Sequence, residues 1–357
     1  MIHDNVEFHN VAELREVEGR DGLRVQRVPE DVRLCLNAGA QERMLSPAGS
    51  EIRFVSAGNK VNVTLSSPGG AAEVIPFFGP FQEKERFQIG KEPRTLELTY
   101  PARLKTIESE AVRDLPFSHN VWRLVLRNTS LHYHSIEGEG LRPPTVDELP
   151  KRRYLSYGTS ITHGASATAM HLTYVSQVAW RLGADLINLG VGGSAYCESE
   201  LADYIAARDD WDVATLSLSV NMMGAGFSLS EFSERVTYMV NAVAGANPDR
   251  PVGCITIYPH FREFCGDAEE RERTAAFRQA LRDAVDSCPH ENAHLIEGTD
   301  MLSNIGGLTV DLIHPGDHGM IEMGERVAGQ LESLLDRDEG DGIIRKVRKV
   351  RRVKKTK

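Results

Sequence analysis

The chain has 357 residues, of which 41% are apolar and 26% charged, so it can build a hydrophobic core and is not expected to be disordered. Its 51 acidic and 41 basic residues give a net charge of −10, which argues against a nucleic-acid-binding protein. It has no run of about 18 apolar residues, no CxxC pair among its five cysteines and no secretory signal at the start, so we expect a cytoplasmic protein without a membrane span.

Residues 1–148 alternate short apolar runs with clusters of glycine, proline, serine and asparagine. The segments KVNVTL and RTLELTY have an apolar residue at every second position, which is typical of half-buried strands. No helical stripe of useful length occurs in this half. The pattern predicts a β-sandwich or jelly-roll domain over residues 1–148, for which recognition of a carbohydrate or shaping of a ligand site is left open. Residues 140–153 contain three prolines and are interpreted as a linker or strap.

From residue 149 to residue 338 the pattern changes to strands that alternate with helices. The predicted strands are the apolar runs at 154–158, 185–191, 213–220, 252–259 and 293–298. Helical stripes of apolar residues lie at 172–182, 232–243 and 275–285, and Asp267 is a suitable N-cap for the third. Short apolar strands between helices predict a five-stranded parallel sheet with helices on both faces, a three-layer α/β/α domain.

The C-terminal end differs in composition from the rest of the chain. A last helix is predicted from about Pro315 to Leu335, with proline at its start. The final 15 residues hold nine lysine or arginine residues and no acid, so residues 339–357 are interpreted as a basic, flexible tail. The charge of this tail also suits contact with RNA, a membrane surface or an acidic polymer, and the sequence leaves that open.

Polar residues and glycines follow the predicted strands at their carboxyl ends, where open parallel sheets bind their ligands. In chain order these residues are Ser160, Gly190, Gly192, Gly193, Asn221, His260, Asp311 and His314. A serine, backbone N–H groups, a side-chain amide and an Asp–His pair are the groups that acyl transfer requires. Taken singly, each has a structural alternative: a helix cap for the serine, tight turns for the asparagine and the glycines, and a surface position for the histidine.

Residues 152–336 resemble the SGNH, or GDSL-like, superfamily of esterases and lipases, which is named for the Ser, Gly, Asn and His of four sequence blocks. The matching residues are Ser160 in YGTSITHG, Gly193 in NLGVGGSA, Asn221 in LSLSVNMMG, and Asp311 with His314 in DLIHP. Gly192 is a neighbouring alternative to Gly193. The family's usual aspartate before the serine is Thr159 here, and GxND becomes Ser219-Val-Asn-Met222. The YGTSIT variant is familiar among bacterial members with an extra N-terminal β domain.

The resemblance implies a serine esterase with a flavodoxin-like catalytic domain and no metal or organic cofactor. His314 is the expected base for Ser160, and Asp311 orients His314. The expected oxyanion hole consists of the backbone N–H groups of Ser160 and Gly193 and the side-chain amide of Asn221. The expected substrate is a short-chain acyl ester of a carbohydrate or a related small alcohol, and the expected reaction is de-O-acetylation.

Four residues beside these motifs are expected to contact the substrate: Tyr157, Thr159, Met222 and Tyr258. Two alternative functions remain: acyl transfer to another alcohol at the same site, and glycan binding without catalysis. GVGGSA at 190–195 also fits a dinucleotide-binding turn, with Asp209 and Asp210 at a suitable distance, but it follows the second strand of its domain instead of the first. The candidate metal ligands are His132, His134, His163 and His171, and no third ligand joins either pair at a convincing spacing, so no metal site is expected.

Overall fold

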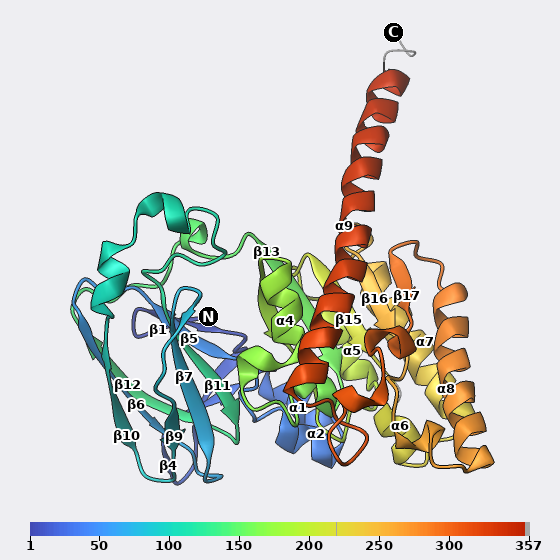
Figure 1. Cartoon of the computed structure of the whole chain (residues 1–357), viewed down its shortest axis with the longest axis horizontal. Coiled ribbons are helices and arrows are strands. Elements are labelled where there is room, and N and C mark those ends of the chain that lie inside the picture. The colour runs from blue at the N-terminus through green and yellow to red at the C-terminus, as the bar shows by residue number, and fades with distance from the viewer. Residues whose placement is uncertain (219, 354–357) are drawn as a thin grey trace.

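The computed structural model describes residues 1–218 and 220–353, with side chains up to residue 336. Ser219 lies outside the described residues, and so do residues 354–357, which form the end of the predicted tail. An antiparallel β region and an α/β region lie side by side (Figure 1). The division into two structural parts that was predicted from the sequence is therefore visible in the fold.

The N-terminal region is built from two antiparallel sheets that enclose an apolar core. Its strands are Ile2–His3 (β1), Val6–His9 (β2), Glu13–Val17 (β3), Arg20–Gln26 (β4), Glu51–Phe54 (β5), Lys60–Ser66 (β6), Ala72–Phe78 (β7), Phe81–Gln82 (β8), Phe87–Ile89 (β9), Arg94–Thr99 (β10), Trp122–Asn128 (β11) and His132–Gly138 (β12). One sheet has the order β1-β2-β5-β11-β7-β8, with β9 also paired to β7, and the other has the order β10-β6-β12-β4-β3. The period of two predicted for β6 is confirmed, because Val61, Val63 and Leu65 are buried while Lys60 and Asn62 are exposed.

Two short helices, α1 (Glu30–Cys35) and α2 (Ala38–Arg43), interrupt the half of the chain in which only strands were predicted. Leu36 and Ala40 are buried in the core of the α/β domain and not in that of the sandwich. The prediction of a purely β N-terminal half is therefore wrong for this segment. Six residues are less than two helical turns, too few to display a recognisable apolar stripe.

The α/β domain contains the predicted five-stranded parallel sheet. Its strands are Arg152–Gly158 (β13), Ala184–Asn188 (β14), Val213–Ser217 (β15), Val252–Ile255 (β16) and Ala293–Ile296 (β17). The order β14-β13-β15-β16-β17 is that of a flavodoxin-like fold, in which the strand order reverses at β13. The carboxyl end of β13 is therefore where a ligand site is expected.

Helices cover both faces of this sheet (Figure 1). The helices α4 (Tyr174–Arg181) and α9 (Asp317–Val353) pack together on one face, whereas α5 (Ser199–Ala206), α7 (Leu229–Ala246) and α8 (Ala268–Asp286) cover the other. Asp267 is the N-cap of α8, as predicted, and accepts the backbone N–H groups of Glu269 and Glu270. The prediction that the last helix ends near Leu335 is wrong, since α9 continues to Val353. No helix among the described residues is long and apolar enough to cross a membrane.

A buried ion-pair network joins the two domains. Arg53 of β5 donates from both terminal nitrogens to the carboxylate of Asp185 on β14, at 2.7 and 2.6 Å, and both residues are buried. Glu51 accepts from Arg53 at 2.8 Å and also from Arg123 of β11. Burying charged groups is costly unless they are paired, so this network favours one position of the sandwich on the α/β domain.

Candidate active site

The turn after β13 presents Ser160 at the carboxyl end of the sheet. Thr159 is the N-cap of the short helix α3 (Ser160–His163), and its side chain accepts the backbone N–H of Ile161. The capping role is therefore filled by Thr159, which leaves the hydroxyl of Ser160 available. Gly158 permits the tight turn, because a Cβ there would lie 2.3 Å from Oγ1 of Thr162.

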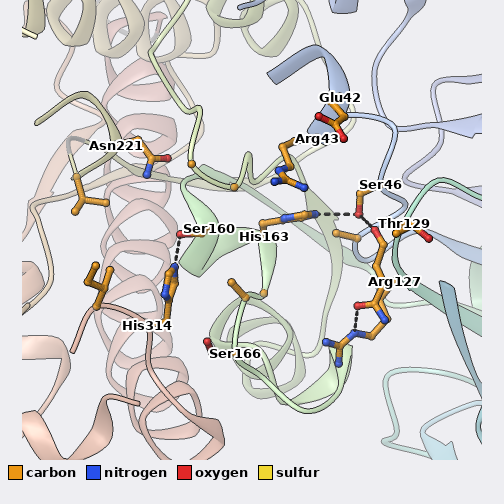
Figure 2. A pocket seen from close by; sticks show the side chains of 18 of the residues that line it. Glu42, Arg43, Ser46, Arg127, Thr129, Ser160, His163, Ser166, Asn221 and His314 are labelled. Carbon is orange, nitrogen blue, oxygen red and sulfur yellow. Dashed lines mark hydrogen bonds between the residues drawn. The ribbon is translucent and has the colours of Figure 1, made fainter. Parts of the chain in front are cut away.

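A chain of hydrogen bonds runs from Ser160 through His314 to Asp311 (Figure 2 shows its first link). Oγ of Ser160 lies 2.8 Å from Nε2 of His314, and Nδ1 of His314 lies 2.6 Å from Oδ2 of Asp311. Oδ1 of Asp311 accepts three further hydrogen bonds, from the hydroxyl of Thr309 and the backbone N–H groups of Ile313 and His314. The loop that bears the base is therefore fixed by the same carboxylate that orients the imidazole.

The environment of Asp311 keeps its carboxylate ionised. Burial alone would raise its pKa, but the hydrogen bonds from the side chain and backbone of His314 and from the backbone of Ile313 outweigh it and hold the pKa well below its usual range. An ionised carboxylate accepts the Nδ1–H of the imidazole, so Nε2 is left as the acceptor that faces Ser160.

The predicted oxyanion groups lie beside the serine. Asn221 belongs to α6 (Val220–Gly224), and its Oδ1 accepts the backbone N–H of Ala195 at 3.2 Å. This bond turns Nδ2 towards Ser160 (Figure 2). On the glycine loop, a Cβ at Gly192 would lie 3.8 Å from Cβ of Ser160, and Gly193 has a φ of +73°, which favours glycine. Both glycines line the same cavity as Ser160, so neither is singled out as the oxyanion donor.

The cavity in front of Ser160 has a volume of about 1050 Å³ and lies between the two domains. The α/β domain contributes Ser160, His314 and the loops around them. The N-terminal half contributes Glu42, Arg43, Leu45, Ser46, Ala48, Gly69 and residues 127–130. The residues from the N-terminal half were not predicted. Apart from Gly69, they lie at the ends of α2 and β11 and in the loops that follow, without a motif, so only the packing of one domain on the other brings them to the site.

Comparison with known proteins identifies the family of this site. Residues 151–332 match the model of the GDSL-like lipase/acylhydrolase family. The chain belongs to this family. No curated protein sequence matches the chain.

Solved structures share the fold of the whole GDSL-like chain, including its N-terminal β region. The salicylyl-acyltransferase SsfX3 from a tetracycline biosynthetic pathway superposes with a TM-score of 0.74 at 17% identity, covering 92% of this chain and 95% of its own. A putative GDSL-like lipase from Bacteroides ovatus gives 0.67 at 18% identity, with coverages of 93% and 96%. A family two carbohydrate esterase from Clostridium thermocellum, in complex with cellohexaose, gives 0.60 at 14% identity, with coverages of 93% and 99%.

The four predicted substrate-contacting residues of this GDSL-like protein do not line the large cavity. Tyr157 and Met222 are completely buried in the core, and the hydroxyl of Tyr157 accepts the backbone N–H of Cys197 at 3.2 Å. Thr159 and Tyr258 are also buried and border a separate void of about 10 Å³. Tyr157 is in β13, whose successive side chains point to opposite faces, so a position near the end of a strand can place a side chain in the core. Thr159 and Tyr258 lie beyond the ends of β13 and β16, and Met222 is in α6.

His163 lies in the cavity wall, on the side that faces the β domain. Its Nε2 lies 3.0 Å from Oγ of Ser46, whose hydroxyl donates to the carbonyl of Asn128 (Figure 2 shows the bond between His163 and Ser46). Burial, together with the positive charges of Arg27 and Arg43, lowers the pKa of His163 to about 3. The ring is therefore neutral near pH 7, and because the hydroxyl of Ser46 is a donor elsewhere, Nε2 of His163 carries the proton.

The four histidines considered as metal ligands lie in two different domains. His132 and His134 belong to β12 of the sandwich and contact the carbonyl of Asp21 and the hydroxyl of Ser66, whereas His163 and His171 belong to the α/β domain. Over residues 1–218 and 220–336, whose side chains are described, no three His, Cys, Asp or Glu side chains are grouped so that they could hold a metal ion.

Proposed function

We propose that the protein is a serine esterase that hydrolyses short-chain acyl esters, with acetyl esters of a carbohydrate or a related small alcohol as its substrates. The observation that carries the proposal is the hydrogen-bonded chain from Ser160 through His314 to Asp311, open to a cavity of about 1050 Å³. Its geometry is that of a nucleophile, a general base and a group that orients the base.

In the proposed reaction, Nε2 of His314 accepts the proton of Ser160 as Oγ attacks the ester carbonyl. The negative charge that develops on the carbonyl oxygen is stabilised by Nδ2 of Asn221 and by backbone N–H groups of Ser160 and of the glycine loop. His314 then protonates the leaving alcohol, and a water molecule repeats the sequence on the acyl-enzyme. Asp311, with its lowered pKa, stays ionised throughout and stabilises the imidazolium.

A saccharide alcohol is supported by the fold and by the dimensions of the site. The carbohydrate esterase of similar fold was solved with cellohexaose and matches this chain over both domains. The cavity takes part of its wall from the β domain, so a substrate larger than the acyl group has a surface on which to lie. The acyl chain is proposed to be short because the lining, rich in glycine, serine and arginine, suits a polar ligand and not a long alkyl chain.

Acyl transfer to an alcohol is the second candidate, and the similarity in fold to a salicylyl-acyltransferase favours it. The two reactions share the acyl-enzyme and differ only in the acceptor that attacks it. Product analysis with and without a sugar acceptor separates them: hydrolysis releases only the free acid, whereas transfer yields the acylated sugar. A protein that binds glycans without catalysis does not require the hydrogen-bonded Ser160–His314 pair, so this alternative is not favoured.

The test is the hydrolysis of 4-nitrophenyl acetate by the wild-type protein and by Ser160→Ala. The variant is expected to lose at least about 10³-fold in kcat, since removal of such a nucleophile removes the covalent route altogether. The thermal unfolding temperature is expected to change little, because Ser160 is not the residue that caps α3. Esters from acetate to octanoate, measured in series, are expected to show falling kcat/KM as the chain lengthens.

A further inference from the structure

Positive charge in the cavity wall is only partly balanced by negative charge. The charged side chains of the lining, apart from histidine, are Glu42, Arg43, Arg127 and Arg262. Arg262 forms an ion pair with Glu270. Arg43 is exposed, and over the residues whose side chains are described its guanidinium forms no hydrogen bond or ion pair. One free cation therefore faces the cavity from the end of α2.

Arg127 is a second cation of this wall, held in place from two sides. Its Nε donates to Oδ1 of Asn128 at 2.9 Å, and Nη2 donates to the carbonyl of Ala167 at 3.0 Å. Its Nη1 is buried without a hydrogen-bond partner and lies 3.8 Å from Oε1 of Glu73, too far for a hydrogen bond. The guanidinium is thus oriented in advance, and its charge is only loosely matched.

A third guanidinium lies directly behind the wall. Arg27 is buried, and all of its hydrogen bonds go to neutral carbonyl oxygens, those of Ser46, Asn188, Gly190 and Arg43, at 2.7 to 3.0 Å. Burial lowers the pKa of Arg27 to about 9, so it is still protonated near pH 7. The electrostatic potential of a buried charge without an acidic partner extends farther than that of a charge paired with a neighbouring carboxylate.

These three residues, Arg43 and Arg127 in the cavity lining and Arg27 behind it, are together called the arginine wall below. The wall stands close to the nucleophile: a Cβ placed on Gly192 would lie 3.8 Å from Cδ of Arg43 and also 3.8 Å from Cβ of Ser160. Figure 2 shows Arg43 beside the ring of His163, with Ser160 on the side of the ring away from Ser46. A ligand that reaches the serine therefore passes within range of these guanidinium groups.

We propose that the arginine wall binds an anionic group of the substrate, so that the natural substrate is an acyl ester that also carries a carboxylate or a phosphate. This inference rests on the proposed esterase function and narrows its substrate class. Guanidinium groups pair with carboxylate and phosphate oxygens in two-pronged geometry, and Arg43 has donors free for such a pair. With a neutral sugar ester, the free donors of Arg43 would bind only water, and the positive charge of Arg27 would add nothing to substrate binding.

The test compares the turnover of matched esters that differ in one anionic group. The first pair, 4-nitrophenyl hydrogen glutarate and its methyl ester, places a carboxylate in the acyl part. The second, 4-acetoxybenzoate and its methyl ester, places it in the alcohol part, and the third, 4-acetoxyphenyl phosphate and 4-acetoxyanisole, places a phosphate there. For each pair, the ratio of kcat/KM for the anionic ester to kcat/KM for the neutral ester is measured, so that effects common to both esters cancel.

We expect Arg43→Ala to lower this ratio about tenfold or more in at least one pair, since a charge-assisted hydrogen bond is lost. Arg43→Lys keeps the charge without the fork and is expected to give an intermediate ratio. Arg103→Ala, which removes an exposed arginine that does not line the cavity, is the matched control and is expected to keep the wild-type ratio. Raising the ionic strength is expected to lower the ratio in the wild type.

The outcomes separate this inference from the function on which it rests. Equal ratios in the wild type and in Arg43→Ala for all three pairs, with neutral esters turned over, overturn the anion site and leave the esterase intact. Failure of the wild type to hydrolyse any of the six esters overturns both. The pair that responds identifies whether the anion belongs to the acyl or to the alcohol part, and whether it is a carboxylate or a phosphate.

Discussion

Replacement of Asn221 tests the proposed oxyanion hole. Its Oδ1 accepts the backbone N–H of Ala195, and this bond turns the donor of the side chain, Nδ2, towards Ser160. This donor meets a full negative charge only in the tetrahedral intermediate, and it therefore stabilises the transition state more than the bound substrate. Loss of one such donor costs about 10²–10³ in kcat, or roughly 3–4 kcal/mol. Asn221→Ala is expected to lower kcat by this factor with little change in KM.

Two variants separate the catalytic effect from a structural one. Asn221→Ala also leaves the buried N–H of Ala195 without its acceptor, at a cost of about 1–3 kcal/mol in the free energy of unfolding. Asn221→Asp keeps an acceptor oxygen for this N–H but has no donor and adds a negative charge, so its stability is expected to be closer to wild type and its kcat at least as low. Steady-state kinetics on 4-nitrophenyl acetate and thermal unfolding measure both quantities. A folded alanine variant with kcat within a few-fold of wild type would refute the assignment.

Two further predictions concern the stability of the fold. Asp185→Asn breaks the buried pair with Arg53 and is expected to lower the free energy of unfolding by about 3–5 kcal/mol in urea titration, because the buried guanidinium then keeps as hydrogen-bonded counter-ion only the carboxylate of Glu51, which it shares with Arg123. Arg142→Ala, which breaks an exposed pair with Glu148, is the control and is expected to cost about 0–1 kcal/mol. The pKa of His163 is about 3 in the folded state and about 6.5 in the unfolded chain, so on acidification the unfolded state binds the extra proton first. The free energy of unfolding is therefore expected to fall by about 1.4 kcal/mol per pH unit as the pH drops from 6.5 towards 3. His163→Gln is expected to flatten this dependence, and an unchanged slope would show that other groups cause it.

The order of the strands and helices could be predicted because each element is long enough to show its own period. The apolar runs at 213–220 and 252–259 correspond to β15 and β16. These two strands were predicted to end three and four residues too late, because the pairing between strands stops where the chain turns into the loops that bear the site. Asp311 and His314 were found because their spacing in DLIHP is a local pattern, and local patterns survive without knowledge of the fold.

The cavity wall could not be predicted, because it depends on contacts between distant parts of the chain. Arg27 and Arg43 lie more than 100 positions before Ser160, and nothing in their immediate sequence marks them as part of a site. They reach it because α2 and the segment before α1 pack on the α/β domain and not on the sandwich. For the same reason the sequence did not reveal that Tyr157, in β13, and Tyr258, three residues beyond β16, are buried, because only packing decides which way the rings point.

Covalent labelling is the most direct test of the proposal that Ser160 is a nucleophile activated by His314. The protein is treated with an organophosphate ester such as paraoxon, digested, and its peptides are sequenced by mass spectrometry. We expect a single phosphorylated residue, Ser160, formed at a rate that falls steeply in His314→Ala, because the base that lies 2.8 Å from Oγ of Ser160 and accepts its proton is gone. An unlabelled Ser160 in a folded protein, or labelling whose rate is unaffected by the loss of His314, would contradict the proposal.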